Sequence, residues 1–239
     1  MNVHSILRGN DTLTVAIVGT DGAGKTTVVR ALPESLSVPS KYLYMGPNIE
    51  SSNVALPWSR LVLRLKLRSY RRTARKEGIT DPSFASTHHN AHRSVQRGPV
   101  LATLANVNRL AEAAYRETLA WTYRRRGYVV IYDRLFLFDG APSPNKRSKR
   151  ANDRAYHWVL AHWFPRPDLV LFLDAPPEVL FARKGEGTLE YLERKRQKII
   201  AQGQGLERFM TVDATQDLGN VISEVCTIIE DSCAQRQRR

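Results

Sequence analysis

The residues best suited to chemistry lie near the amino end of the sequence, in the segment GTDGAGKT at positions 19–26. This segment fits the pattern G-x-x-x-x-G-K-[ST], follows an apolar run and precedes a helix-forming stretch. Glycines at two inner positions let the backbone curl, so that successive N–H groups face the phosphates of a nucleotide. The sequence therefore predicts a phosphate-binding loop made by Gly22, Ala23, Gly24, Lys25, Thr26 and Thr27.

Three side chains of this loop have distinct expected roles. Lys25 is expected to reach the β- and γ-phosphates of ATP, and the Thr26 hydroxyl is expected to ligate Mg²⁺. Asp21 is unusual, because a carboxylate in an anion-binding loop repels a triphosphate. Two interpretations of Asp21 stay open: it orients the phosphate acceptor, or it makes a turn by hydrogen-bonding its own backbone.

Five short apolar runs are the elements that position this loop. Four of them end at Gly or Asp, and the fifth ends one residue after Asp213. They occupy residues 13–19, 41–46, 128–133, 168–174 and 209–214. Continuous β-branched and aromatic runs of this length are typical of strands buried on both faces of a parallel sheet. Because helix-like stretches separate them, we expect a layered α/β fold, and the absence of a linker favours a single domain over residues 1–239.

A long helix is expected before the third run. Between residues 100 and 127 a stripe at helical spacing predicts a packed helix that ends at Gly127. Its members are Leu104, Val107, Ala111, Ala114, Thr118 and Trp121.

Four segments together resemble the thymidylate kinase branch of the P-loop nucleoside and nucleotide kinases. They are GTDGAGKTT, VVIYDRLFLFDG, RPDLVLFLDAPPEVLFAR and TVDAT, in that order along the chain. The resemblance implies a three-layer fold with a five-stranded parallel sheet in the order 2-3-1-4-5, flanked by helices. It also implies a lid at about residues 184–198 and ATP-dependent phosphoryl transfer to a nucleoside monophosphate or nucleoside.

The resemblance assigns roles at the ends of the third and fourth runs. Asp133 would act on Mg²⁺ or its waters and Arg134 would neutralise phosphate charge, although the pair also fits a structural ion pair at a strand end. Asp174 would lie near the Mg²⁺ or would cap the helix that follows it. Arg183 resembles the arginine that starts the lid.

The lid and the adenine side complete the expected site. In the lid, Arg194 and Arg196 are the residues expected to reach the transferring phosphate, with solvated helix charges as the alternative. Asp213 and Ala214, within VDAT, resemble the loop that contacts adenine through backbone groups.

The acceptor side departs from the family pattern. The family usually carries an Arg-Glu-Pro-Gly-Gly stretch after its second strand, and this chain has YMGPNIESSN. Glu112 stands where the family has an arginine for the acceptor phosphate, so Arg109, one helical turn away, and its neighbour Asn108 become the substrate-side candidates together with Asp21. The departure leaves the acceptor, and whether it offers a hydroxyl or a phosphate, undetermined.

The charge is strongly positive, with 36 Lys and Arg against 23 Asp and Glu for a formal net charge of +13. Much of it lies in a basic substrate-side insert at about residues 47–100, for which we favour helix over residues 60–76 and consider contact with an anionic membrane. His88 and His92 in this insert have the i, i+4 spacing of a metal pair, but no third ligand is obvious.

Other acceptors and partners stay open at this point. A kinase of a sugar or lipid-linked glycan precursor is one alternative, and a P-loop ATPase stimulated by nucleic acid or a protein partner is another. The kinase interpretation disfavours nucleic acid as a partner. We further expect a cytoplasmic protein, since there is no long apolar segment, and consider a homodimer because family members are often dimers.

Overall fold

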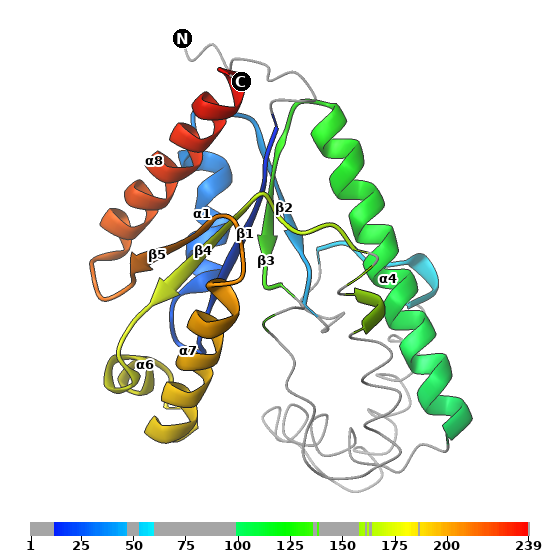
Figure 1. Cartoon of the computed structure of the whole chain (residues 1–239), viewed down its shortest axis with the longest axis horizontal. Helices are drawn as coiled ribbons and strands as arrows, with labels where there is room; N and C mark the ends of the chain where they lie inside the picture. Colours follow the sequence, from blue (N-terminus) through cyan, green and yellow to red (C-terminus); the bar gives the residue numbers. More distant parts are fainter. Residues whose placement is uncertain are drawn as a thin grey trace, which may run out of the picture.

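Five parallel strands form one sheet through the middle of the protein, in the order β2-β3-β1-β4-β5 (Figure 1). The computed structural model describes residues 12–46, 53–59, 99–135, 138, 158–160, 162, 164–185 and 187–238. The strands are β1 (Thr14–Gly19), β2 (Ser40–Tyr44), β3 (Val129–Asp133), β4 (Leu169–Asp174) and β5 (Phe209–Asp213). The five predicted strands and their expected order are confirmed.

Burial on both faces explains why these runs are strands. Every residue of β1 and β3 is buried, as are the first five residues of β4. A strand covered on both sides needs apolar residues at each position, which is the pattern in the sequence. Since all five strands are parallel, their carboxyl ends lie at one edge of the sheet, where Gly19, Asp133 and Asp174 end β1, β3 and β4.

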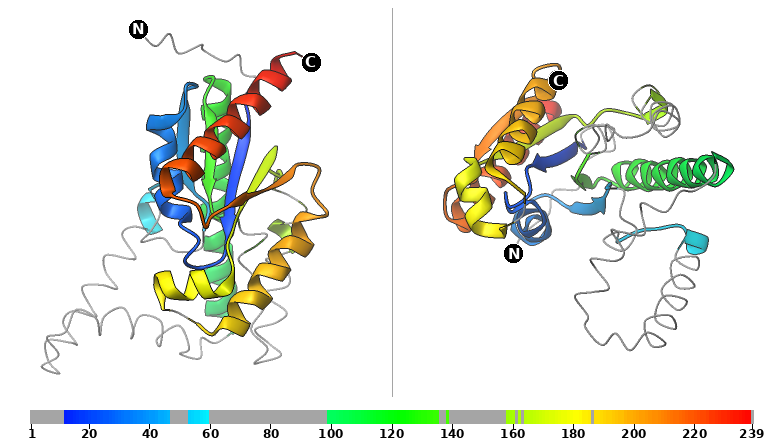
Figure 2. Two further views of the ribbon diagram at one scale, coloured as in Figure 1. Left: turned by 90° about the vertical axis from the view of Figure 1, so that its left-hand side faces the viewer. Right: turned by 90° about the horizontal axis from the view of Figure 1, so that it is seen from below.

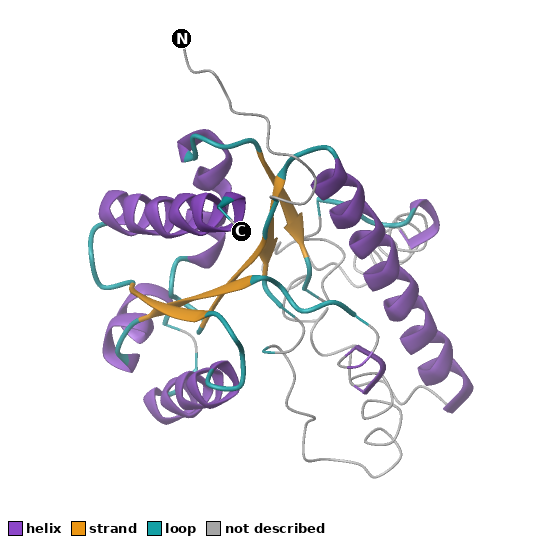
Figure 3. Ribbon diagram, turned by 45° about the horizontal axis from the view of Figure 1, so that its top comes forward, coloured by secondary structure: helices purple, strands orange, loops and turns teal. Residues whose placement is uncertain are grey.

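Helices α1 (Lys25–Ser35) and α8 (Leu218–Gln237) cover one face of the sheet (Figure 3). Leu32 and Ile229, one from each helix, are completely buried with Ile17 and Leu171 of the sheet. This packing fixes the direction in which α1 leaves the loop after β1. The amino end of α1 is therefore held at the carboxyl edge of the sheet.

The opposite face is covered by α4 (Pro99–Arg125) and by α7 (Leu189–Gly203), which follows the short helix α6 (Pro177–Lys184). Figure 2 shows α8 and α4 on opposite sides of the sheet. Ala120 of α4 and Ile199 of α7 are buried against strand residues such as Phe172. The layers are thus helices, sheet and helices, as the resemblance implied.

The long helix is present, but the predicted packed stripe is on its exposed side. Val107 is 57% exposed and Trp121 is 53% exposed, and the residues between them on the stripe are exposed as well. The buried positions are instead Glu112, Arg116 and Ala120. Hydrophobic periodicity was misleading here, because the inward face of α4 carries Glu112 and Arg116 beside Ala120, while the predicted stripe faces outward.

Most of the basic insert lies outside the described residues. Residues 47–52 and 60–98, including the histidine pair and the segment expected to be helical, are not among them. Within the described part of the chain, no helix is both long enough and apolar enough to cross a membrane.

Candidate active site

The loop between β1 and α1 has the backbone conformation that only glycine adopts easily. Gly22 has a φ of 91° and Gly24 a φ of 80°. A Cβ atom on Gly22 would lie 2.7 Å from the carbonyl oxygen of Leu180 in α6, closer than real Cβ atoms approach. Positive φ and this close approach both exclude a side chain at Gly22. The glycines of the sequence pattern are therefore required by the fold of the loop.

The amino end of α1 is left without a side-chain cap. Gly24 is the N-cap and offers no side-chain hydrogen bond, and the first turn contains no acidic residue. By contrast, α7 is capped by Thr188, whose hydroxyl accepts from the Tyr191 backbone N–H at 3.2 Å. Uncapped N–H groups at a helix start favour an anion. The exposed Thr26 and Thr27 lie in this first turn, after the buried Ala23.

Lys25 begins α1 and is buried, with 8% of its surface exposed. Its Nζ donates to the Thr20 carbonyl oxygen at 2.6 Å, so the amine curls back over the loop. It lines a cavity of about 10 Å³ together with Gly19, Arg134 and Lys195. Three cationic side chains from three different elements thus converge at the carboxyl edge of the sheet.

Asp21 forms an ion pair with Lys195 of α7, with 2.7 Å between Oδ2 and Nζ. Burial acts to raise the pKa of Asp21, but the hydrogen bond and charge of Lys195, followed by the charges of Lys25 and Lys184, hold it below its usual value. The self-turn interpretation of Asp21 is wrong, because its carboxylate accepts from Lys195 of α7 and from no backbone group of its own turn among the described residues.

The two lid arginines have other partners. Arg194 is largely exposed and lies 3.9 Å from Glu190, whereas Arg196 donates to both oxygens of Asp174 at 2.6 and 2.8 Å. In this conformation the cation at the loop is Lys195, which sequence reasoning missed. The buried Leu192 and Ile199 mark the inward face of α7. Since positions three and four apart share a helix face, this spacing was the available signal for Lys195 and against Arg194.

Asp133 closes β3 and is buried, with 1% of its surface exposed. Its Oδ2 accepts from the Tyr42 hydroxyl of β2 at 3.2 Å, and its Oδ1 has no hydrogen-bond partner among the described residues. Burial raises the pKa of Asp133, opposed by the Tyr42 hydrogen bond and by the charges of Arg134, Lys25 and Arg30. A buried carboxylate with one vacant oxygen suits a ligand that is itself a cation or a donor.

Arg134, the next residue, has a φ of 67°, the only positive φ outside glycine in the described part of the chain. Non-glycine residues rarely adopt this conformation, and strain of this kind gathers at functional sites. No ion pair joins Arg134 to Asp133, whose one described partner is Tyr42. The structural ion-pair interpretation is therefore not supported, and the guanidinium side chain lines the same cavity as Lys25.

The residues at this edge fit Mg²⁺ in the way that nucleotide enzymes usually hold it. Magnesium prefers oxygen ligands and is commonly bound by one or two carboxylates together with substrate phosphates. Asp133 offers a vacant buried oxygen, and Thr26 offers a hydroxyl at the start of α1. Among the described residues there is no cluster of three or more metal-ligating side chains, so phosphate oxygens would have to complete the coordination.

Asp174 is engaged by Arg196 through both carboxylate oxygens, which occupies the atoms that a metal would need. The alternative that Asp174 caps the following helix is wrong. Pro176 is the N-cap of α6, and no side chain makes a capping hydrogen bond there.

Arg183 lies beside the segment expected to contact adenine. Its Nη1 donates to the Ala214 carbonyl oxygen at 2.8 Å. Asp213 accepts from the backbone N–H and the hydroxyl of Thr215, and these hydrogen bonds lower the pKa of its carboxyl. The Arg183 side chain is thus held beside Ala214, directly after β5.

The two substrate-side candidates on α4, Asn108 and Arg109, lie outside the cavity beside Lys25. The Asn108 side-chain oxygen accepts from Trp58 Nε1 at 2.9 Å and from the Ser59 hydroxyl at 3.3 Å, so it ties α4 to residues 53–59. Arg109 is half-buried on the same helix. Neither side chain lines the cavity that contains Lys25.

A residue missed by sequence reasoning lies closer to that cavity. Arg116 is buried on α4, 3.6 Å from Glu112, and its Nη1 donates to the Gly46 carbonyl oxygen at 2.8 Å. A Cβ on Gly46 would lie 3.0 Å from Cδ of Arg134, so Arg116 and Arg134 approach the same short segment after β2. Its signal in the sequence was the i, i+4 spacing to Glu112.

Comparisons with known proteins find nucleotide kinases among the relatives and among the solved structures of this fold. No family model matches the chain. A curated thymidylate kinase of Xanthomonas campestris pv. campestris is 29% identical over 95% of this chain and 86% of its own length. Among solved structures, the thymidylate kinase of Candida albicans is similar with a TM-score of 0.57 at 21% identity, covering 92% of both chains. The deoxyadenosine kinase of M. mycoides has a TM-score of 0.53 at 16% identity, covering 92% of this chain and all of its own.

Proposed function

We propose that this chain, a thymidylate kinase-like P-loop kinase that transfers phosphate from ATP to a nucleotide or nucleoside, acts on a deoxynucleoside monophosphate. One observation carries the proposal. The uncapped start of α1 and the cations Lys25, Arg134 and Lys195 converge beside the vacant oxygen of Asp133. Such convergence of positive groups suits the phosphates of a donor and an acceptor meeting end to end.

In the proposed reaction the protein positions and neutralises phosphates. The backbone N–H groups at residues 22–27 hold the phosphate chain of ATP, and Lys25 leaves the Thr20 carbonyl to meet its outer phosphates. Mg²⁺, when bound by Thr26 and Asp133, would supply further charge neutralisation. Arg134, which lines the cavity beside Lys25, would neutralise charge that spreads over the transferring group, and the Tyr42 hydroxyl fixes one oxygen of Asp133.

The acceptor side supports a substrate that already carries a phosphate. Arg116 and Arg134 both approach Gly46, directly after β2, and the burial of Arg116 leaves its charge little screened by water. A second anion at this position would be stabilised by the charge of Arg134 and by the hydrogen-bond donors of Arg116, whose own charge is partly balanced by Glu112. An uncharged nucleoside hydroxyl gains less from these groups. We therefore assign to Arg116 the contact that Arg109 and Asn108 were expected to make.

On the donor side, the adenine ring would lie against Ala214 and Arg183. The Ala214 backbone N–H donates to the Asp174 carbonyl oxygen at 2.7 Å and its carbonyl oxygen accepts from Arg183. We therefore expect the base to contact the anchored Arg183 guanidinium, because both backbone groups of Ala214 are already hydrogen-bonded. This position makes Arg183 a residue of the base pocket, distant from the transferring phosphate.

The α7 helix is proposed as part of a lid over residues 184–198. A cavity of about 10 Å³ beside Lys25 holds no more than one water, and we expect α7 to move outward when a triphosphate binds. The Lys195–Asp21 and Arg196–Asp174 pairs are the contacts that would break and reform.

Replacing Lys195 by alanine is expected to lower kcat about tenfold to a hundredfold, because one cation is removed from the transferring phosphate. Replacing Arg194, one position away and largely exposed, should change kcat less than about twofold. Steady-state kinetics of the two variants decide the matter. An equal loss of kcat in both variants would mean that the total charge of α7 matters and the face on which each charge lies does not.

The proposed acceptor is tested by incubating the protein with ATP, Mg²⁺ and a panel of nucleosides and nucleoside monophosphates, with mass spectrometry of the products. We expect a diphosphate to accumulate from a deoxynucleoside monophosphate. Transfer to nucleosides alone would replace the proposed acceptor, and ATP hydrolysis that needs no acceptor and is stimulated by DNA would contradict the kinase itself.

The relatives and structures named above are nucleotide or deoxynucleoside kinases, so the sugar, glycan-precursor and ATPase alternatives gain no support from them.

A homodimer is proposed on the exposed side of α4, where Val107, Ala111 and Ala114 form an unpartnered stripe among the described residues. Contact of the basic insert with an anionic membrane stays a proposal from the sequence.

A further inference from the structure

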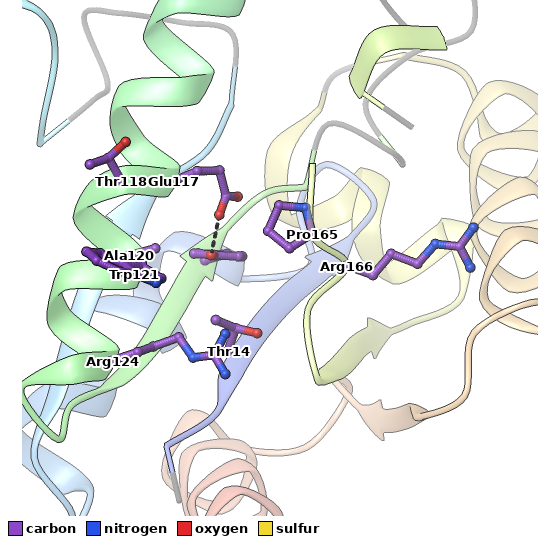
Figure 4. A pocket seen from close by; sticks show the side chains of 9 residues that line it. Thr14, Glu117, Thr118, Ala120, Trp121, Arg124, Pro165 and Arg166 are labelled. Atoms are coloured by element: carbon purple, nitrogen blue, oxygen red, sulfur yellow. Dashed lines mark hydrogen bonds between the residues drawn. The ribbon is translucent and has the colours of Figure 1, made fainter. Parts of the chain in front are cut away.

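The space beside the phosphate-binding loop is small, and α7 forms part of its wall. This cavity measures about 10 Å³, which is room for one water. The larger cavity in Figure 4, of about 370 Å³, lies between α4 and the start of β1 and is lined by Glu117 and Arg124 among others. Since Thr14 lines it and Gly19 lies at the other end of β1, this larger space is separate from the loop. Room for a triphosphate at the loop therefore depends on what holds α7 in place.

An ion pair joins α7 directly to the loop. Asp21 Oδ2 accepts from Lys195 Nζ at 2.7 Å, with 25% of the Asp21 side chain and 21% of the Lys195 side chain exposed. Among the described residues, the other ion pairs of α7 do not reach the loop, since Arg196 pairs with Asp174 at the end of β4 and the rest lie within the helix. In the described part of the chain, the Asp21–Lys195 pair is therefore the ion pair that ties α7 to the loop.

Asp21 also balances positive charge that gathers at the loop. Lys25 and Lys195 line the same cavity, and the charges of Lys25 and Lys184 act on the Asp21 carboxylate together with that of Lys195. Amines that lie close together repel one another unless an anion lies among them, and the repulsion is stronger where water is partly excluded. In this conformation the Asp21 carboxylate is that anion. A negative charge in an anion-binding loop thus has a physical reason.

The phosphates of a nucleotide would compete with Asp21 for these amines. A triphosphate carries several negative charges against one on the carboxylate, and the two repel each other when both lie at the loop. Lys195 therefore gains Coulomb energy by leaving Asp21 for the phosphate chain. The carboxylate and a bound phosphate are alternative partners of the same amine.

We propose that Asp21 is an internal anion that positions α7 over the phosphate-binding loop through Lys195, and that the phosphate chain of a nucleotide displaces it from this amine. When phosphate leaves, the carboxylate takes Lys195 back, so Asp21 opposes tight binding of the nucleotide and favours its release. The proposal rests on the proposed function in taking the loop as the phosphate site. It gives Asp21 a positioning role that needs no contact with the acceptor.

Hydrogen exchange of the α7 backbone amides tests the positioning role in the full chain without catalysis. Before any phosphate is added, Asp21→Asn should speed this exchange about threefold to tenfold, because asparagine keeps the shape but loses the charge that attracts Lys195. Saturating inorganic tripolyphosphate should return the exchange to the wild-type rate under the same conditions, since phosphate then supplies the anion. Glu34→Gln is the control, because it removes one negative charge at the exposed end of α1 far from the loop, and it should change the α7 rates less than about twofold.

Calorimetric titration with tripolyphosphate measures the competition. Asp21→Asn should bind it about tenfold more tightly than wild type. Loss of simple repulsion also tightens binding, so the same change is made in a Lys195→Gln background, where the pair is already absent. There Asp21→Asn should leave α7 exchange unchanged and tighten binding no more than about threefold, which is the non-additivity expected of two groups that interact.

Lys195→Gln alone should speed α7 exchange to the same extent as Asp21→Asn, and it gives the measurement if that variant does not fold. The proposal is overturned if either variant exchanges like wild type, or if Asp21→Asn has the same effects with and without Lys195. It is also overturned if Asp21→Asn raises KM for the acceptor and leaves tripolyphosphate affinity unchanged, which would make Asp21 an acceptor contact. Neither exchange nor calorimetry involves phosphoryl transfer, so failure of this proposal and failure of the kinase assignment are distinguishable.

Discussion

Replacing Lys25 by methionine is expected to lower kcat by about 10²–10³, because one positive charge is withdrawn from the phosphates at the moment of transfer. Methionine keeps the buried unbranched stem and removes only the amine. The fold should lose about 1 kcal/mol or more, since the hydrogen bond to the Thr20 carbonyl oxygen disappears. Steady-state kinetics give the first quantity and thermal or urea unfolding gives the second.

A matched control is Lys41→Met. Lys41 lies in β2 with its amine 5.2 Å from the centroid of the Tyr128 ring, at the far end of the strand from Asp133. Its loss should leave kcat unchanged within about twofold. A Lys25→Met enzyme with wild-type kcat would refute the role of this lysine, and a Lys25→Met protein that is unfolded would show that the amine serves the fold.

Replacing Asp133 by asparagine is expected to reduce kcat about a hundredfold, with a much smaller change in KM for ATP. Asparagine preserves an oxygen for the Tyr42 hydroxyl but removes the negative charge from the buried, vacant side of the carboxylate. Burial disfavours the charged form of Asp133, so the substitution should leave the free energy of unfolding unchanged or increase it. A gain in stability with a loss of turnover is the pattern of a residue retained for function.

Asp168→Asn is the matched control, for which we expect a loss of stability without a loss of turnover. This carboxylate lies before β4, where it accepts from the Thr14 backbone and hydroxyl and from Arg236 of α8 at 2.6 Å. Despite burial, these hydrogen bonds hold its pKa below the usual value, so Asp168 stabilises the fold at neutral pH and loses this effect as the pH falls through its folded pKa. Asp168→Asn should cost about 1–3 kcal/mol of unfolding free energy and leave kcat intact. If both aspartates lower stability alike, Asp133 is a structural carboxylate.

The sequence was sufficient for the sheet and for the phosphate-binding loop because both depend on local patterns. Strands buried on both faces require uninterrupted apolar runs, and the runs ending at Gly19, Asp133 and Asp174 are such strands. Gly22 and Gly24 are needed for their positive φ angles, a property of the residue type that no distant contact alters. The thymidylate kinase resemblance rested on these same segments, and the comparisons agree with it.

The sequence was a poorer guide to side chains whose position depends on which face of a helix turns inward. Lys195 was passed over in favour of its arginine neighbours, because a run of positive charges does not indicate which member points at the loop. On α4 the apolar stripe through Val107 and Trp121 is exposed, while Glu112 and Arg116 are buried. Amphipathic patterns fail where the inward face serves a polar site, since the charged residues there are paired within the protein.

The sequence by itself thus determined the strands, their carboxyl-end residues and the glycine-rich loop after β1, since each follows from residue type and short-range spacing. Only the tertiary structure decided which side chains meet there. The Tyr42 hydrogen bond to Asp133 exists because β2 pairs with β3, and Lys195 reaches Asp21 because α7 packs across the sheet edge. The cavity beneath Glu117 and Arg124 likewise exists only between α4 and β1. Contacts between segments distant in the chain are set by packing, which short-range patterns do not encode.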